Sequence, residues 1–447
     1  MKRALQILTY KGITHGEQHL LPLKIKFKQM KKAGLLMLML VALNSFSQEK
    51  LSLQQCYTLA EGNFPLAKQK KLLTTQNQLD LEVIKTGKLP KMDFQAQATY
   101  QSDVISLPFT SPTSTITPPN KDQYQATVSI NQLIYDGGLI DASLAEKSAS
   151  LKTQQKQVEV NLYQLKEQVN QFYFSILLLQ EKRELLLAKK TQLETTLKEV
   201  KSGIKFGVLL PNSDSVLEAE LLKIDQQLME VNLNKTSLMS TLSMLIGIPV
   251  SPNIILENTE ITVDLKTEIE RPELDLFQLQ KEKVDASEQL IDKKNSPKLS
   301  GFATGGYGNP GLNMLDNSFQ TYYIAGIKLN WNVFDWNSTK KQRESLQVTK
   351  EIIDSEQEVF ELNTVMEMTQ QQSEINKISA FIASDEEIIA LRKKILETSS
   401  SQLKNGVITS SAYVTELTNL FEAENNLSTH QIQLQFAKAN YKTTKGF

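Results

Sequence analysis

Very few residues of this 447-residue chain have the types and spacing that catalysis or metal binding requires. A nucleophilic or metal-dependent site needs histidine, cysteine and carboxylate side chains that converge on one point. After residue 29 the chain has a single histidine, His430, in a polar helical stretch, and a single cysteine, Cys56, in a more apolar one. We therefore expect a solvated His430, a packed Cys56, no cofactor, no metal ion and no enzymatic activity.

One group of glycines could be mistaken for a phosphate-binding loop; it consists of Gly301, Gly305, Gly306 and Gly308. Such a loop needs a helix N-terminus directly behind it, because the N–H groups at that end bind the phosphate. Here the glycines interrupt an alternating strand pattern, so we interpret them as small residues in a tilted strand or its bend. A net charge of −1 gives no sign of nucleic-acid binding.

The N-terminal part has the pattern of an exported protein. Lys31 and Lys32 precede an apolar run over 33–43, and two serines follow at positions suited to cleavage. We predict a signal peptide at 30–47, preceded by an overcalled start at 1–29. No later stretch has about 18 consecutive apolar residues, so the sequence does not favour a helical inner-membrane protein.

A strand, a corner and a long helix occur twice in the same order. The strand at Tyr124 is followed by a corner over 135–138 and by a helix that reaches Gly207. The strand at Tyr323 and the glycine at Gly406 stand one constant step further on, since 323 − 124 and 406 − 207 both equal 199. An ungapped register over such a span indicates an internal repeat.

These landmarks divide the exported chain into three parts. We predict a first repeat at 48–246, a linker at 247–270 that begins with Gly247 and Pro249, and a second repeat at 271–447. Each repeat is expected to contain a helix, two strands joined by a loop, a helix of about 65 residues, a turn and a returning helix.

The helices carry apolar stripes. A first helix is expected over 51–88, and in the long helix after Gly138 apolar residues recur at spacings of four and three, the heptad pattern of a coiled coil. This stripe consists of Val158, Leu162, Leu165, Val169, Phe172, Ile176, Leu179, Leu186, Leu193, Leu197, Val200 and Ile204. The long helix of the second repeat, expected over 337–403, has a stripe of its own: Val348, Ile352, Val359, Leu362 and Met366.

Each strand is apolar on one face and polar on the other. From Tyr124 onwards apolar residues stand at even positions and polar ones at odd positions, and the strands from Met92 and Tyr323 alternate similarly. Half-buried strands of soluble sheets share this pattern with strands that separate membrane lipid from a water-filled lumen. Open strand edges are not tolerated in lipid and four strands cannot close a barrel, so a membrane interpretation requires several copies; three would supply twelve strands.

The combined order over about 400 residues is similar to that of the TolC-type outer-membrane factor family, or outer membrane efflux proteins. The resemblance depends on the doubled strand and helix register, on Gly207 and Gly406 followed by apolar turns, and on the segments Ile246–Pro249 and Arg271–Leu274. It implies a membrane α+β protein. Three copies would form a 12-stranded β-barrel in outer-membrane lipid, continued by a periplasmic α-helical coiled-coil tunnel.

The resemblance also implies a function and partners. The chain would be the exit duct of a tripartite efflux pump or type I secretion system in a Gram-negative bacterium, a passive conduit for small molecules or proteins. An inner-membrane RND or ABC transporter would drive it through a periplasmic adaptor (membrane fusion) protein. The adaptor would dock on the turns that narrow the tunnel: Gly207, Val208, Leu209, Gly406, Val407 and Ile408. The alternative is a secreted coiled-coil scaffold or adhesin without channel activity.

The sequence also offers candidate residues for the gate and for the membrane interface. Family members often carry acidic residues just after the second-repeat glycine, but here 407–413 contains none, so the candidate gate acids are Asp214, Glu218 and Glu416. Three copies of such an acid would attract cations, although Asp214 is also placed to interact with the dipole of its own helix. Aromatic residues near the strand ends are candidates for the membrane interface: Tyr100, Tyr124, Tyr323 and Trp331.

Overall fold

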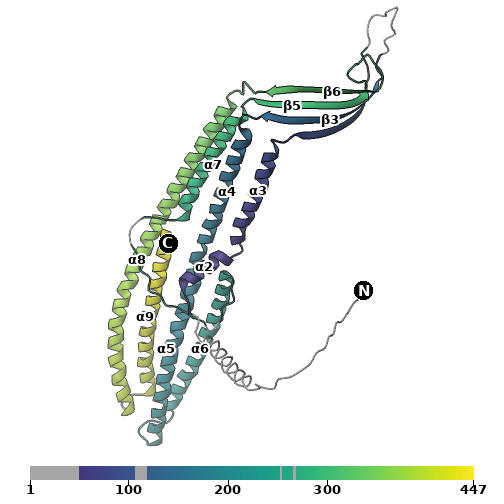
Figure 1. The fold of residues 1–447 in the computed structure, drawn as a ribbon. Coiled ribbons are helices and arrows are strands. Elements are labelled where there is room, and N and C mark those ends of the chain that lie inside the picture. Colours follow the sequence, from purple (N-terminus) through teal and green to yellow (C-terminus); the bar gives the residue numbers. More distant parts are fainter. Residues whose placement is uncertain (1–49, 106–117, 252–253, 265–267) are drawn as a thin grey trace, which may run out of the picture. The chain divides into compact units, whose positions relative to one another are not determined.

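The computed structural model describes most of the chain (Figure 1): residues 50–105, 118–251, 254–264 and 268–447. Leu51–Phe447 forms one compact unit. The predicted start at 1–29 and the predicted signal peptide at 30–47 lie outside the described residues. Among the residues that are described, no helix combines the length and the hydrophobicity needed to cross a lipid bilayer.

The described elements come in two similar series. The first contains β1 (Lys50–Leu51), α2 (Leu53–Asn63), α3 (Ala67–Thr86), β2 (Lys91–Tyr100), β3 (Asp122–Tyr135), α4 (Leu139–Tyr163), α5 (Leu165–Lys205) and α6 (Ser213–Ile246). The short strand β4 (Ile255–Leu256) follows and pairs with β1. The second series contains α7 (Pro272–Lys294), β5 (Lys298–Asn309), β6 (Gln320–Asn330), α8 (Ser338–Lys404) and α9 (Ser410–Lys445).

Two helices predicted as continuous are each divided in two. The prediction of one helix over 51–88 is wrong, because Pro65 has no N–H and its neighbour Phe64 is extended, with ψ of 139°. The predicted long helix of the first repeat is interrupted at Gln164. There α4, which packs against α3 and α7, gives way to α5, which packs against α6 and α9. In the second repeat α8 is continuous over 67 residues.

The four long strands form one antiparallel sheet in the order β2-β3-β5-β6. The register places Phe94 opposite Val128, Val128 opposite Gly305, and Gly305 opposite Tyr323, so the apolar positions of all four strands share one face. On the other face the hydroxyls of Ser129 and Thr304 are 2.9 Å apart. The predicted alternation of the strands is therefore confirmed, and it extends across the whole sheet.

The glycines that resemble a phosphate loop lie within β5, and the element behind them is a strand. Gly306 faces the ring of Tyr322 on β6, where a Cβ atom would approach Cζ of that ring to 2.3 Å. Gly326 lies in the same way against the ring of Phe302, 3.0 Å from its nearest carbon. The prediction that these glycines are strand residues is confirmed, and at Gly306 the cause is a covering aromatic ring.

The apolar stripes of the two long helices have different surroundings. Within the first stripe Val169, Ile176, Leu186 and Leu193 are completely buried, in clusters formed with α6 and α9. The stripe predicted for α8 is exposed, with Val348 53% and Leu362 61% accessible. The helix instead buries other residues against its own chain: Ile353, Met368, Ile375, Ile378, Ile389, Leu396 and Leu403. A sequence stripe alone therefore does not tell which partner it faces.

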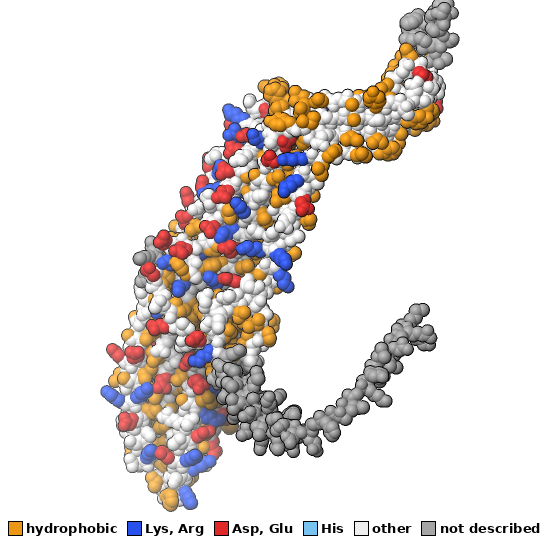
Figure 2. Space-filling view, in the orientation of Figure 1, with side chains coloured by type: hydrophobic (Ala, Val, Ile, Leu, Met, Phe, Trp, Pro, Cys, Tyr) orange, Lys and Arg blue, Asp and Glu red, His pale blue; other side chains and the backbone are white. Residues whose placement is uncertain are grey.

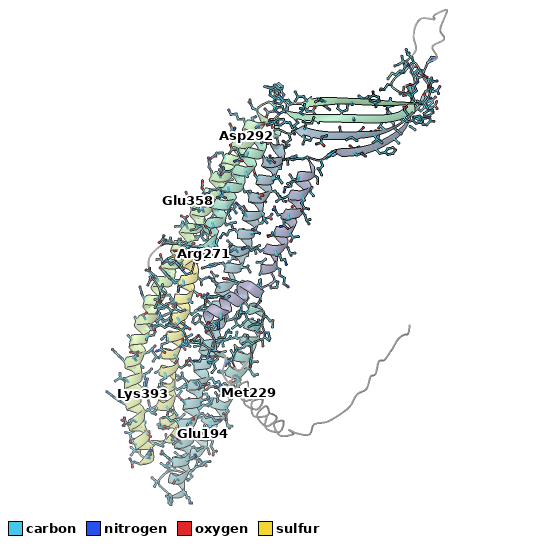
Figure 3. The ribbon with its side chains drawn as sticks, viewed as in Figure 1. Glu194, Met229, Arg271, Asp292, Glu358 and Lys393 are labelled. Carbon is cyan, nitrogen blue, oxygen red and sulfur yellow. The ribbon has the colours of Figure 1, made fainter. Side chains whose placement is uncertain are left out.

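The Arg271–Leu274 segment holds the start of the second series in place (Figure 3). The guanidinium of Arg271 lies 5.2 Å from the ring centroid of Tyr163 and 5.5 Å from that of Phe360. Its Nε donates to Glu273 at 2.9 Å, and Pro272 opens α7. The segment thus links α4, α7 and α8 through one buried cation.

Candidate functional site

The candidate docking turns have the same backbone in both repeats. Gly207 and Gly406 are left-handed, with φ of 74° and 69°. In each turn the N–H of the next residue, Val208 or Val407, donates to a carbonyl five residues earlier at 2.8 Å. This is the Schellman arrangement that favours glycine after a helix C-terminus. The sequence repeat therefore corresponds to two equivalent chain reversals.

The structure brings the two turns together. A Cβ atom on Gly406 would lie 3.0 Å from the carbonyl oxygen of Val208 and 3.9 Å from Cδ2 of Leu209. Val208 and Val407 are exposed, whereas Leu209 and Ile408 pack against the core of the coiled coil. The turns consequently present apolar side chains side by side.

The candidate gate acids are not joined to one another by any ion pair or hydrogen bond among the described residues. Glu218 pairs with Lys201 on α5 at 2.6 Å, and Glu416 approaches Arg392 on α8 to 3.4 Å. Asp214 lies in the first turn of α6, where its carboxylate complements the helix dipole. Two of the three acids thus have a cationic neighbour on the adjacent helix.

A buried ion pair within the coiled coil escaped the sequence analysis. Lys189 Nζ lies 2.8 Å from Glu220 Oε1 and 3.3 Å from the hydroxyl of Thr418, over the ring of Phe421. The side chains of Lys189 and Glu220 are only 5% and 12% exposed. The sequence spacing could have predicted that Lys189 is buried, because it stands three residues after Leu186 and four before Leu193, both in the apolar stripe. The pair joins α5, α6 and α9.

The prediction of a solvated His430 is wrong. Its Nδ1 lies 2.5 Å from Asp385 Oδ2, and its ring centroid lies 5.4 Å from that of Phe381. The contact arises because α9 packs extensively against α8, so a polar pair can be enclosed between them. Cys56 is buried as predicted, and burial raises the pKa of its thiol to about 12, which keeps it protonated and unreactive.

The corners that join the sheet to the long helices are capped by aspartates. Asp136 accepts the N–H groups of Gly138 at 2.9 Å and Ile140 at 2.7 Å, and Asp335 accepts that of Thr339 at 2.9 Å. Burial alone would raise the pKa of Asp136, but these N–H groups lower it below its ordinary value. The hydroxyl and N–H of Thr339 likewise lower the pKa of Asp335. The two caps are again 199 residues apart.

The candidate interface aromatics occupy two levels of the sheet. Tyr100, Tyr124 and Tyr323 lie on the apolar face, toward the loop end of the strands. Trp331 directly follows β6, at the end nearest the helices, and is 57% exposed. The four aromatic residues thus stand at two levels of the sheet, with apolar positions between them.

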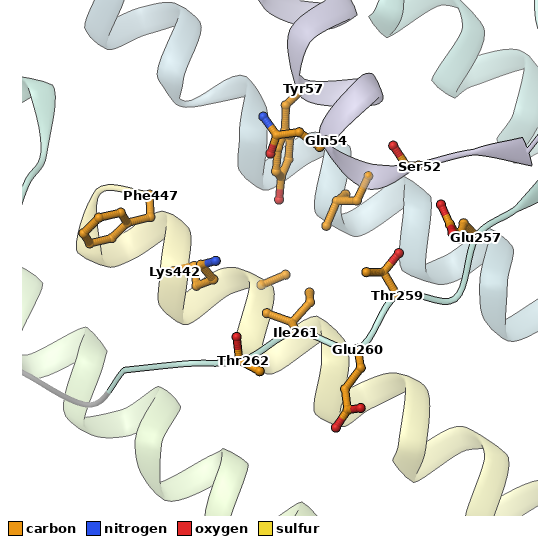
Figure 4. A pocket seen from close by; sticks show the side chains of 12 residues that line it. Ser52, Gln54, Tyr57, Glu257, Thr259, Glu260, Ile261, Thr262, Lys442 and Phe447 are labelled. Carbon is orange, nitrogen blue, oxygen red and sulfur yellow. The ribbon is translucent and has the colours of Figure 1, made fainter.

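One cavity of the helical part has no histidine or cysteine in its lining (Figure 4). It measures about 350 Å³ and lies where α2, the segment before α7 and the end of α9 meet. Its lining includes Tyr57, Glu257, Lys442 and Phe447 but neither histidine nor cysteine. No group of three or more potential metal ligands exists in the part of the chain that the structure describes.

Comparison with known proteins gives a consistent result. Residues 68–247 match the model of the outer membrane efflux protein family. The outer membrane protein VceC of Vibrio cholerae shares 15% identity and a TM-score of 0.62, over 88% of this chain and 96% of that one. The Campylobacter jejuni CmeC outer membrane channel shares 14% identity and a TM-score of 0.61, over 88% and 85%. For the open state of the Neisseria gonorrhoeae MtrE outer membrane channel the values are 13%, 0.61, 88% and 89%.

No curated protein matches the sequence. At identities of 13% to 15% the likeness to the solved channels shows the fold alone. The family match concerns the sequence itself and includes α3, the first hairpin and the first coiled coil. By these findings residues 68–247 match the outer membrane efflux protein family in sequence, and the chain has the fold of the solved outer-membrane channels, in line with its resemblance to TolC-type outer-membrane factors.

Proposed function

We propose that three copies of this chain form an outer-membrane exit duct for efflux or secretion. The observation that carries the proposal is the two-faced sheet, whose edge strands β2 and β6 have no partner among the described residues. An apolar face with open edges suits lipid only when the edges pair with further copies. Four strands from each of three copies would give a 12-stranded barrel around the polar face.

The internal repeat predicts how neighbouring copies pair. β5 repeats β2 with an offset of 207 residues and β6 repeats β3 with an offset of 199, and the two hairpins have the same register under these offsets. Ala126 on β3 lies opposite Tyr307 on β5. The same offsets, as 126 + 199 and 307 − 207, place Ala325 of one copy opposite Tyr100 of the next.

The exposed stripe of α8 supports the same assembly. Its apolar residues are more than half exposed in a single chain: Val348 53%, Ile352 53%, Val359 55%, Leu362 61% and Met366 54%. A monomeric soluble protein rarely exposes a continuous apolar patch of this kind. In the proposed tunnel these residues are covered by the helices of the next copy.

We infer the transport partners from the end of the duct that carries the two turns. The paired turns at Gly207 and Gly406 expose Val208 and Val407, which suit docking of a periplasmic adaptor. Behind it an inner-membrane RND or ABC transporter would supply the energy, and the duct itself would be a passive conduit without enzymatic activity. The three gate acids remain candidates; Glu218 and Glu416 would act through the balance with their neighbouring cations, and Asp214 through its own carboxylate.

The predicted register can be tested by cysteine cross-linking in the outer membrane. Ala325→Cys combined with Tyr100→Cys should give an oxidant-dependent covalent trimer, because directly opposite residues have Cβ atoms about 5 Å apart. The matched control pairs Ala325→Cys with Ala96→Cys, four residues away along the strand, and should not cross-link. The native Cys56 is the only cysteine of the sequence and is buried, so it gives little background.

Two outcomes would contradict the proposal. A soluble periplasmic monomer or dimer would refute the duct and leave the coiled-coil scaffold or adhesin. An outer-membrane trimer that cross-links only in the control variant would retain the duct but refute the register. The docking turns are tested separately: Val407→Glu should abolish co-purification of the adaptor from membranes while leaving the trimer intact.

A further inference from the structure

We propose that the duct prefers anions, and that a collar of unpaired lysines at the base of the barrel causes this preference. The collar consists of Lys91, Lys298 and Lys328. The inference rests on the proposed trimeric duct and adds to it a class of favoured solutes, namely those with net negative charge.

The polar face of the sheet carries charge at one end only. Lys91 is the first residue of β2, Lys298 is the first of β5, and Lys328 is the third from the end of β6. Each of these strand ends adjoins a helix, because β2 and β5 follow α3 and α7 and β6 precedes α8. The three lysines therefore lie at the helix end of the sheet. The rest of this face is uncharged except for Asp93, two residues beyond Lys91.

The register shows that the lysines share the polar face. Lys91 pairs with Asn131 on β3. Asn131 lies on the same face as Ser129, because the two residues are two positions apart along the strand. Lys328 pairs with Ser300, and Lys298 stands two residues from Ser300. Lys298 and Lys328 are thus diagonal neighbours, about 7–8 Å apart at their backbones. The apolar face has no charged residue between its ends.

None of the three lysines has an ion pair or a side-chain hydrogen bond in the described part of the chain. The only bond in this group is from Ser300 Oγ to the backbone carbonyl of Lys328, and it leaves the ammonium free. This contrasts with the helices, where lysines such as Lys201 and Lys350 pair with acids. Figure 2 shows a similar division: charged side chains are spread over the helices, whereas the visible part of the sheet is mostly hydrophobic or uncharged.

In three copies the collar would contain nine lysines and three aspartates, a net charge of +6. Charges on the low-dielectric wall of a channel focus the field into the lumen and concentrate counter-ions there. The Debye length of about 8–10 Å at physiological salt lets neighbouring lysines of the ring act together. At the other end of the duct two of the three candidate gate acids, Glu218 and Glu416, have cationic neighbours that offset their charge.

The experiment is a reversal-potential measurement on purified trimers in a planar lipid bilayer under a tenfold KCl gradient at low salt. Wild-type protein should pass chloride at least about threefold more readily than potassium. The triple variant Lys91→Gln, Lys298→Gln and Lys328→Gln should lose this preference, whereas the matched triple variant to arginine should keep it. Asp93→Asn should increase it, and the triple variant to glutamate should reverse it.

The outcomes separate this proposal from the proposed function. Wild-type current with unchanged selectivity in the glutamine variant, or with cation selectivity from the start, would overturn the collar while the duct stands. Wild-type trimers that carry no current at all would overturn the duct and the collar together. Trimer formation by the arginine and glutamine variants, judged by gel mobility, excludes misfolding as the cause of a difference.

Discussion

The two corners that join the sheet to the long helices have the same backbone and different residues. In the first, Gly137 and Gly138 have φ of 69° and 84°; in the second, Trp336 and Asn337 have φ of 55° and 60°. Left-handed backbone costs a residue with a side chain about 1–2 kcal/mol, and glycine avoids this cost. The same turn is thus made at low cost in one repeat and under strain in the other.

The surroundings of the corners explain this difference. A Cβ atom on Gly137 would lie 2.2 Å from the Cβ atom of Ser296, so the first corner is closed by the chain itself. Trp336, its counterpart, is 81% exposed. Under the offset of 207, the position that corresponds to Ser296 is Leu89, which in the proposed trimer belongs to the next copy. The two corners therefore have the same backbone, but only at the first corner does the neighbouring segment belong to the same chain.

The largest effect is expected at a position where the first repeat buries a charge and the second exposes an apolar residue. Lys189 corresponds to Ile388, 199 residues later, yet Lys189 is buried in an ion pair and Ile388 is exposed. Lys189→Met should destabilise the coiled coil by about 3 kcal/mol, because it leaves Glu220 buried with only the more distant Lys223. Urea unfolding followed by circular dichroism measures this loss.

The double variant Lys189→Met with Glu220→Leu is the control for that prediction. Replacing both partners removes the buried charge, so most of the lost stability should return, to within about 1 kcal/mol of wild type. A double variant as unstable as the single one would show that Lys189 acts through packing against Phe421 rather than through its charge.

The corners provide a second test. Gly137→Ala should cost about 3 kcal/mol, since it adds a clash with Ser296 to left-handed strain. Gly138→Ala should cost about 1 kcal/mol, because the nearest atoms to its new Cβ, those of Lys293, are 3.8 Å away and only strain remains. Thermal unfolding of the two variants compares them directly. Equal losses would mean that the first corner is not closed by Ser296.

The aspartate caps should respond to pH in the same direction in both repeats. Their pKa values are lowered in the folded chain, so each cap stabilises fully above the ordinary carboxyl pKa of about 3.9, and this contribution disappears as the pH falls through the lower folded value. Asp136→Ala should therefore cost about 1 kcal/mol at pH 7 and less as the pH falls below the ordinary carboxyl pKa. Stability curves over this pH range check the sign. A loss that persists at low pH would mean that the side chain acts by packing rather than as an ionised cap.

The smallest effect is expected at the strained corner. Trp336→Gly relieves left-handed strain but adds freedom to the unfolded chain, so the stability of an isolated copy should change by less than about 0.5 kcal/mol. The trimer should become easier to dissociate if the next copy covers this ring. Comparing monomer unfolding with trimer dissociation in detergent distinguishes the two effects, and an unchanged trimer would mean that Trp336 faces lipid or water instead.

The sequence predicted those features that depend on local spacing. The period of two identified the strands, and the heptads and paired glycines identified the coiled coils and their turns. Pro65 could have divided the first helix in the prediction, since proline excludes a helix interior. The interruption at Gln164, the burial of Lys189 and the exposure of the α8 stripe could not be predicted with equal ease, because each depends on which helix lies alongside.

The ring of Tyr322 has a consequence for anything that would leave through the barrel. It lies on Gly306, and its hydroxyl accepts a hydrogen bond from Gln125 on a third strand, so it is held along the sheet. In the proposed duct the Tyr322 ring thus lies flat against the inner wall at this level and does not project into the lumen. The width of the exit there therefore does not depend on a change of the Tyr322 rotamer, so this ring would not have to move before a bulky cargo could pass.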